Sequence, residues 1–318
     1  MRLRDDPLLI EAAAVRASEI TSRPVRHLRK DFWLTEVLRA CAQKADEIGV
    51  ELAFKGGTSL SKVFGLIDRF SEDVDLLVVA AGSDHAIETA MKSLVRAAEE
   101  ATGLEAALEV ETVHKGDYRA CYFSFPNAPD GDRGVKLELG NRGGAVPRDV
   151  RTITSPVAET AAILLGETIE EAASFEVAVL SPARTLVEKL VILHEAHGRS
   201  GPGRDDRVRS VVRHYYDVHQ LLRSEEVRAE LAGIGTMVTA REVCQHTKAL
   251  GMASTSYPVG GFSTSKAFNR DATLLQAREY KVVLPQYLWP GSTLPNYQEC
   301  ESRRVSRRLN RFQHGQIF

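Results

Sequence analysis

The chain has 318 residues, of which 43% are hydrophobic and 26% charged, and its formal net charge is −2. This composition excludes disordered and fibrous proteins, and the length predicts two domains. No apolar run reaches the roughly 18 residues that a membrane-spanning helix needs. The four cysteines lie far apart and form no CxxC pair, so neither a disulfide framework nor a zinc ribbon is indicated. We therefore expect a cytoplasmic protein without a membrane partner.

The first half of the chain mixes helical and strand patterns. Apolar residues recur at helical spacing over residues 8–22, 31–48 and 86–101, and Gly49 is a natural stop for the second of these helices. Apolar or alternating runs predict strands near residues 51–54, 74–80, 107–113, 118–125 and 134–139, with a brief helix after the glycine pair at 56–57. We predict an α+β domain with a mixed sheet over residues 1–156.

From about residue 157 the pattern becomes helical. The segment SPARTLVEKLVILHEAH offers Ser181 as an N-cap and Pro182 at the first helical position, and another helical pattern covers residues 210–224. Two stretches, 198–206 and 253–275, have the composition of exposed loops. We predict a mainly helical domain over residues 157–318 that completes the active site and ends in a basic tail, so that the molecule is bilobed.

The strongest functional signal begins with the glycine turn in FKGGTSLSK at residues 54–62. Gly56, Gly57, Thr58 and Ser59 open a helix, where free backbone N–H groups and two hydroxyls are suited to bind a phosphate. A tight turn explains a lone glycine pair equally well. No Walker A or GxGxxG pattern occurs, which argues against a P-loop or a Rossmann cofactor domain.

Two acids follow in RFSEDVDL at residues 69–76. Strand alternation places Asp73 and Asp75 on one face, with Val74 pointing into the core. Neighbouring carboxylates repel each other unless a cation lies between them, and oxygen ligands suit Mg²⁺. Two solvated acids at a strand edge would explain the acids alone. Together with the glycine turn, however, they predict a nucleotide site with its magnesium ion.

These two motifs resemble the first motif of the DNA polymerase beta-like nucleotidyltransferase superfamily, and more narrowly the AbiEii/MenT-type toxins of bacterial toxin–antitoxin systems. In that family a GG[ST] turn precedes a DxD pair, as KGGTSLSK precedes RFSEDVDL here. The lead-in HLRKDFWLTEVLRA is also similar to the family, and the resemblance runs over roughly residues 10–290. It implies a nucleotidyltransferase-like lobe followed by a helical lobe.

Three further segments resemble later motifs of the family. VKLELG at 135–140 offers Glu138 as a third metal-binding carboxylate, although an ion pair with Lys136 would explain it too. LVEKLVIL at 186–193 matches a lysine motif at Lys189, whose ammonium would contact the triphosphate unless it pairs with a surface glutamate. RHYYDVHQL at 213–221 matches at Asp217, to which the family assigns an active-site role. Spacing alone supports only an exposed Arg213–Asp217 salt bridge, on the helix face away from the buried stripe.

Two arginine-rich segments offer basic surface in a nearly neutral chain. Residues 199–213 hold five Arg against two Asp, and the last 18 residues hold five Arg against one Glu. Solvated faces are commoner than nucleic-acid sites, but a polyanion could bind here. The candidate RNA-binding residues are Arg199, Arg204, Arg207, Arg209, Arg303, Arg304, Arg307 and Arg308. His194, His197, His214 and His219 lack the spacing of a zinc site and read as satisfied helix histidines.

The resemblance implies an enzyme that transfers a nucleoside monophosphate from an NTP to the 3′ acceptor end of tRNA, with Mg²⁺, or Mn²⁺ in its place, as cofactor. Such a toxin blocks aminoacylation, inhibits growth, acts in phage defence and has a cognate antitoxin as partner. The implied catalytic residues are Asp73, Asp75, Lys189 and Asp217. Two alternatives stay open, namely transfer to a protein hydroxyl and a non-catalytic nucleotide-binding module regulated by an antitoxin.

Overall fold

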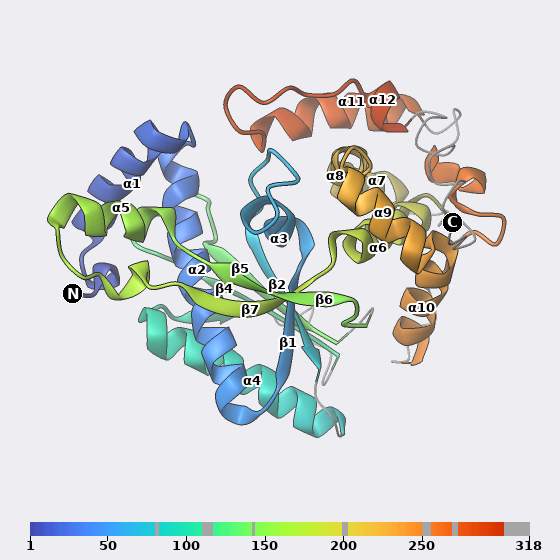
Figure 1. The fold of residues 1–318 in the computed structure, drawn as a ribbon. Coiled ribbons are helices and arrows are strands. Elements are labelled where there is room, and N and C mark those ends of the chain that lie inside the picture. The colour runs from blue at the N-terminus through green and yellow to red at the C-terminus, as the bar shows by residue number, and fades with distance from the viewer. Residues whose placement is uncertain are drawn as a thin grey trace. The chain divides into compact units, whose positions relative to one another are not determined.

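The computed structural model describes residues 1–79, 83–109, 117–141, 144–198, 203–249, 256–268 and 273–301 (Figure 1). The chain divides into two compact units. The first unit comprises residues 1–63, 70–141 and 148–180, and the second comprises residues 64–69, 142–147 and the chain from Ser181 onward. The domain boundary predicted between residues 156 and 157 stays a prediction, and the division into compact units falls after Leu180.

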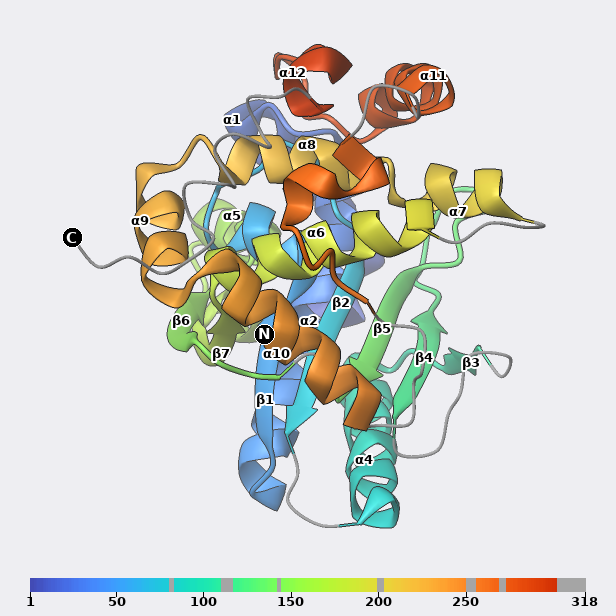
Figure 2. The same ribbon diagram turned by 90° about the vertical axis from the view of Figure 1, so that its right-hand side faces the viewer.

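A mixed seven-stranded sheet forms the centre of the first unit, in the order β3-β4-β5-β2-β1-β7-β6. The strands are β1 (Glu51–Lys55), β2 (Asp73–Val79), β3 (Ala106–Leu108), β4 (Tyr118–Phe123), β5 (Val135–Gly140), β6 (Arg148–Ile153) and β7 (Phe175–Leu180). Strand β2 runs parallel to β5, and β1 runs parallel to β7, whereas the other pairs are antiparallel. Figure 2 shows β5, β4 and β3 following one another toward one edge of this sheet.

The helices of the first unit are α1 (Pro7–Thr21), α2 (Val25–Ile48), α3 (Gly56–Lys62), α4 (Asp84–Thr102) and α5 (Pro156–Leu165). Helices α2 and α4 pack against each other and against the strands, and α1 and α5 pack against α2 (Figure 1). The alternate residues Val74, Leu76 and Val78 of β2 are buried, because they face this helical layer. The predicted α+β class with a mixed sheet is thereby confirmed.

The described part of the second unit consists mainly of helices. Its helices are α6 (Pro182–Gly198), α7 (Arg204–Val211), α8 (Arg213–Leu221), α9 (Glu225–Ile234), α10 (Thr236–Ala249), α11 (Thr273–Val283) and α12 (Tyr297–Glu301). Helix α6 packs against α7, α8, α9 and α10. Its start follows the prediction, because Pro182 is the first helical residue and the Ser181 hydroxyl accepts a hydrogen bond from the Arg184 N–H at 3.3 Å.

Three features differ from the sequence predictions. Strand β7 lies in the region that the sequence predicted as helical, and helix α2 begins at Val25 instead of Asp31. The predicted helix after residue 157 ends at Leu165, where Gly166 adopts a φ of 63°. In the described part of the chain, every helix is too short or too polar to cross a membrane.

Candidate active site

The glycine turn joins the end of β1 to the start of α3. Gly56 has a φ of 83°, and a Cβ atom built on it would lie 1.9 Å from the Oδ2 atom of Asp75. A side chain at this position would therefore collide with the carboxylate and would also strain the backbone. The turn has to be glycine so that the chain can pass directly against the acid of β2.

The two hydroxyls of the turn are directed to the backbone. Thr58 Oγ1 donates a hydrogen bond to the carbonyl of Asp73 at 2.5 Å, and Ser59 Oγ donates to the carbonyl of Gly56 at 3.0 Å. Both side chains are buried. Thr58 thus fastens α3 to the start of β2, and Ser59 closes the turn itself. The predicted binding of a phosphate by Gly56, Gly57, Thr58 and Ser59 stays a prediction.

The sheet brings the acids to one face. Asp73 and Asp75 are half-buried on either side of the fully buried Val74, as alternation predicts. In the parallel β2–β5 pair, Asp75 lies beside Glu138 and Asp73 lies beside Lys136. Long-range strand pairing therefore brings together the acids of two motifs that are more than sixty residues apart in the sequence.

Burial and mutual repulsion shift the acids' pKa values apart. Burial, and then the charges of Glu138 and Asp73, raise the pKa of Asp75 well above its ordinary range. Burial also acts on Glu138, but hydrogen bonds from Asp75 and Lys136 outweigh it and lower the pKa of Glu138. Lys136 forms an ion pair with Glu138. Burial, and then the charge of Glu138 and a hydrogen bond to it, raise the pKa of Tyr118. Of these two acids, Asp75 therefore binds a proton more strongly than Glu138 does.

The donor chemistry of these acids fits a divalent cation, since Mg²⁺ prefers carboxylate oxygens and a cation can replace the proton held at Asp75. Within the described residues, however, no three His, Cys, Asp or Glu side chains are arranged so that they would hold a metal ion. Glu138 is engaged by Lys136. The assignment of Asp73, Asp75 and Glu138 as metal ligands stays a prediction.

A second polar cluster lies inside the second unit, around Asp217 of α8. Its carboxylate is fully buried and accepts two hydrogen bonds from Arg69, from Nε and from Nη2, both at 2.7 Å. Lys189 of α6 reaches the same carboxylate at 2.9 Å, and its Nζ atom lies 3.3 Å from Nδ1 of His214. Two of the predicted catalytic residues, Lys189 and Asp217, are therefore in direct contact.

The charges of this cluster are unequal. Burial alone would raise the pKa of Asp217, but Arg69 and Lys189 lower it well below its ordinary range. Burial, and then the charge of Lys189, lower the pKa of His214 to about 4. His214 is therefore neutral at pH 7 and can accept a hydrogen bond from Lys189. Arg69 and Lys189 thus place two cationic side chains on the one buried carboxylate of Asp217.

The structure corrects one prediction about α8. Asp217 does not lie on an exposed face with Arg213, because Asp217 is completely buried and its carboxylate pairs with Arg69 and Lys189. The Arg213 guanidinium instead lies 4.7 Å from the centre of the Tyr287 ring. The helix is buried on a wider arc than the apolar stripe indicated, because the charges of Arg69 and Lys189 compensate the acid within it.

Sequence reasoning missed three residues of these clusters. Arg69 is the first residue of the RFSEDVDL segment, but the local pattern gives it no role, because its partner Asp217 is 148 positions away. The sequence indicates only an ordinary helix histidine at His214 and a strand residue at Tyr118. A buried acid with two cationic partners cannot be recognised from the local pattern.

The arginine segments are only partly described. Arg199, Arg303, Arg304, Arg307 and Arg308 lie outside the described residues. Arg204 begins α7, which also carries Arg207 and Arg209. The Arg209 side chain is half-exposed and forms ion pairs with Asp206 and Glu279. Binding of RNA by these arginines stays a prediction.

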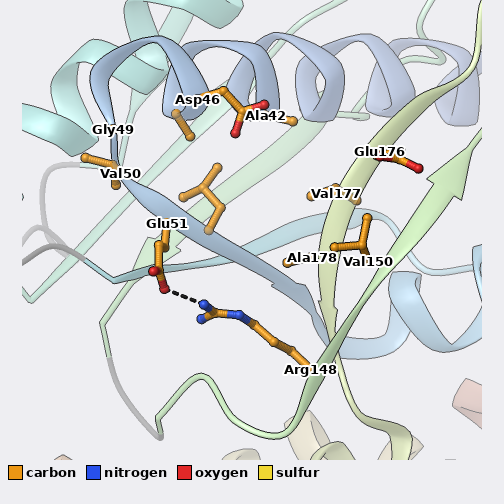
Figure 3. Close-up of a pocket in the computed structure, with 12 residues that line it drawn as sticks. Ala42, Asp46, Gly49, Val50, Glu51, Arg148, Val150, Glu176, Val177 and Ala178 are labelled. Atoms are coloured by element: carbon orange, nitrogen blue, oxygen red, sulfur yellow. Dashed lines mark hydrogen bonds and ion pairs between the residues drawn. The ribbon is translucent and has the colours of Figure 1, made fainter.

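A pocket of about 600 Å³ lies in the first unit, between the end of α2 and strands β1, β6 and β7 (Figure 3). Its walls are mainly aliphatic, and Glu51 forms an ion pair with Arg148 at its edge. None of the predicted site residues lines this pocket. The acid cluster on β2 and β5, and not this pocket, is therefore the candidate active site.

Comparison with known proteins gives one family match. The family model described as nucleotidyl transferase AbiEii toxin, type IV TA system, matches residues 39–288, which include the glycine turn, the acids and the Lys189–Asp217 pair. The lead-in segment 27–40 lies almost wholly outside this match. No curated protein sequence matches the chain. Among solved structures, the nucleotidyltransferase toxin MenT4 of Mycobacterium tuberculosis is similar, with 16% identity, a TM-score of 0.48, and coverage of 95% of this chain and 99% of that one.

Proposed function

Because the chain belongs to the nucleotidyl transferase AbiEii toxin family of type IV toxin–antitoxin systems, we propose that it transfers a nucleoside monophosphate from an NTP to the 3′ acceptor end of tRNA. The 3′ oxygen of the acceptor forms a bond to the α-phosphorus, and the bond between that phosphorus and pyrophosphate breaks. Transfer to this end blocks aminoacylation, so that translation and growth stop.

One observation carries this proposal. Gly56 passes directly against the carboxylate of Asp75, and the strand pairing places Glu138 beside the same acid. A glycine turn at a helix start next to repelling carboxylates suits a nucleotide and the divalent cation that accompanies it.

The reaction would use Mg²⁺, which would lower the pKa of the attacking hydroxyl and neutralise charge on the leaving pyrophosphate. Asp73 and Asp75, with Glu138, would hold the ion. The residues of the turn would orient the phosphates. The protein therefore contributes mainly placement and electrostatic stabilisation.

The acceptor is tested by incubating the purified protein with each α-labelled NTP, Mg²⁺ and either total tRNA or lysate protein. We expect label in tRNA and none in tRNA whose 3′-terminal diol has been oxidised with periodate. The matched enzyme control is Asp149→Asn, an exposed acid on β6, which should label tRNA normally. Label in protein alone would contradict the proposal, and label in neither acceptor would leave only a nucleotide-binding module.

Lys189 offers a second test. Its ammonium has three N–H groups, of which Asp217 and His214 engage two, so we propose that the third serves the triphosphate. Lys189→Ala should raise the KM for NTP by about tenfold, as expected for loss of a charge-assisted hydrogen bond, and should leave tRNA affinity nearly unchanged. Steady-state kinetics measure the KM for NTP, and a tRNA-binding titration measures the tRNA affinity. A selective loss of tRNA affinity would contradict this role.

A further inference from the structure

An aromatic and cationic surface lies beside the acids, on the same face of the sheet. Tyr122 of β4 pairs with Lys136 of β5, which pairs in turn with Asp73 of β2. Because directly paired residues share a face, the three side chains form a row across neighbouring strands. Tyr122 lies at the end of this row that is farther from the glycine turn.

The guanidinium of Arg133 covers Tyr122, with 3.6 Å between the Cζ atom and the centre of the ring. Glu109 holds Arg133 in an ion pair at 3.2 Å and contacts Lys136 at 3.5 Å. The Arg133 side chain nevertheless stays 59% exposed. One face of the planar guanidinium therefore rests on the ring, while a large part of the group is open to solvent.

The segment that carries Arg133 is held firmly. A Cβ atom on Gly134 would lie 2.0 Å from the carbonyl oxygen of Phe123, and the φ of Gly134 is 94°, so only glycine allows this close approach. Asp132 accepts a hydrogen bond from the Gly134 N–H at 2.9 Å and from the buried Lys30 at 2.7 Å. The position of Arg133 above Tyr122 is therefore preorganised.

The geometry of nucleotidyl transfer indicates on which side of the acids the acceptor binds. The attacking and leaving oxygens lie on opposite sides of the phosphorus in an in-line displacement. Gly56 approaches Asp75 from the β1 side, whereas Glu138 and then β4 follow on the other side. If the triphosphate binds at the glycine turn, as the proposed function requires, the acceptor enters over β5 and β4, where Tyr122 and Arg133 lie.

We propose that Tyr122 and Arg133 form a stacking platform for an unpaired nucleobase at the 3′ end of an RNA acceptor. Unpaired bases of RNA stack on aromatic rings and on the planes of arginine guanidinium groups. A serine or threonine hydroxyl acceptor has no such planar group of its own. The assignment rests on the proposed function for its direction, and it names the surface that receives the acceptor.

The test uses the full-length protein and two labelled RNA hairpins, one blunt and one with four unpaired nucleotides at its 3′ end. Fluorescence anisotropy gives both affinities in EDTA, without NTP and at fixed salt. Arg133→Ala and Tyr122→Ala should each weaken binding of the overhang hairpin by about tenfold, as loss of one stacked base predicts, and should hardly change binding of the blunt one. Tyr122→Phe should retain the affinity because it keeps the ring.

Two further variants separate stacking from charge and from folding. Arg133→Lys keeps the charge but lacks the plane, so it should lose overhang binding as Arg133→Ala does. Arg16→Ala removes another exposed, ion-paired arginine of the same unit, on α1, and should bind both hairpins normally. Thermal unfolding of each variant checks the fold.

The outcomes are distinct. Unchanged overhang binding by Arg133→Ala, or an equal loss on both hairpins, would overturn the platform, because the second result indicates only phosphate attraction. A loss of affinity for the overhang hairpin alone supports the stacking platform. If that loss is seen but no RNA takes up label from an NTP, the platform stands as an RNA site and the proposed transfer fails. Label in RNA with unchanged binding by the variants overturns the platform alone.

Discussion

At the scale of single residues, Gly56 shows what the sequence reveals and what it hides. The pair at 56–57 predicts a turn at a helix start, and the structure confirms a helix that begins at Gly56. The sequence does not tell which glycine meets an acid. Only the antiparallel pairing of β1 and β2, which sets Lys55 beside Asp75, brings the next residue against that carboxylate.

Gly56→Ala is expected to abolish most transfer activity. The new methyl group would collide with Asp75 and displace the acid, whereas the strain of a positive φ alone costs about 1 kcal/mol. Gly65→Ala is the matched control, since Gly65 has a φ of 60° and open space around its Cα. Rates of NMP incorporation compare the two variants. Equal losses in both would show that backbone strain, and not the contact with Asp75, is responsible.

Asp75→Asn tests the acids by stability as well as by activity. Because the pKa of Asp75 is raised in the folded state, the metal-free wild type loses stability as pH rises above the ordinary range of an aspartate. An amide keeps a donor toward Glu138 without the charge. In EDTA at pH 7–8 the variant should therefore unfold at a higher temperature than the wild type, and this advantage should shrink toward pH 4.

The same variant reports on the metal. Mn²⁺ should raise the unfolding temperature of the wild type and have little effect on Asp75→Asn, which should also neither transfer nucleotides nor arrest growth. Asp149→Asn should respond to Mn²⁺ as the wild type does. Equal stabilisation of Asp75→Asn by Mn²⁺ would contradict the metal assignment.

At the scale of elements, the first half of α2 fixes the approach to both acid-bearing strands. His27 stacks on Phe70, with ring centroids 4.2 Å apart, and Lys30 bridges Glu72, just before β2, to Asp132, just before β5. The apolar spacing predicts a helix only from Asp31, although the family resemblance extends to the lead-in segment HLRKDFWLTEVLRA. These polar residues continue the helix because acids from other segments neutralise Lys30 in the buried position.

Lys30→Met should destabilise the protein by about 2–3 kcal/mol, because Glu72 and Asp132 lose a buried partner. Transfer should fall as well, since the segments that lead to Asp73 and Glu138 become looser. Lys44→Ala removes an exposed pair on the same helix and should cost less than about 0.5 kcal/mol. Urea unfolding measures the loss of stability in both variants. A loss in Lys30→Met as small as that in Lys44→Ala would contradict a stabilising role for Lys30.

The second missed element, β7, illustrates a limit of local patterns. FEVAVL alternates as a strand should, but the helical patterns on both sides of it predict a helical region. Its place in the sheet depends on parallel pairing with β1, more than a hundred residues earlier in the sequence. Such long-range pairing leaves no local trace, whereas helix caps such as Ser181 and Gly49 do.

At the scale of the whole molecule, the motifs were predicted better than their partners. The motifs that contain Asp75 and Lys189 could be located from the sequence. The cluster around each of these residues forms within its own unit. The sequence could not locate Arg69, Lys30 and Tyr122 in this way, because the role of a buried cation or a stacked ring depends on the residues that it contacts. Charge neutralisation over long sequence distances is the part of the fold that the pattern of apolar residues does not contain.

A buried charge cluster also ties the start of the chain to residues 170–171. Glu171 accepts hydrogen bonds from the Leu3 and Arg4 N–H groups at 2.9 and 3.1 Å, and Arg4 lies 3.6 Å from Glu36 of α2. Burial raises the pKa of Glu36 from its ordinary value near 4.5 to about 7. The folded protein therefore binds a proton that the unfolded chain releases between these two pH values.

Stability of the wild type should fall as pH rises through this window, by roughly 3 kcal/mol from Glu36 alone. Glu36→Gln removes this contribution. The difference in free energy of unfolding between the variant and the wild type should therefore shift in favour of the variant from pH 4.5 to 7 and stay constant above pH 7. Glu19→Gln, at an exposed position on α1, should follow the wild type. Denaturant titrations at several pH values decide, and parallel curves for wild type and Glu36→Gln would contradict the shift.

All four cysteines of the chain, Cys41, Cys121, Cys244 and Cys300, are buried as free thiols. Maleimide reagents should therefore react slowly with the native protein and fast once it opens. A single cysteine introduced at Arg133 or Arg16 would be the one readily alkylated group, so a photo-crosslinker or a fluorophore can be attached there without first removing the natural thiols. The molecule is thus ready for site-directed labelling beside its acids.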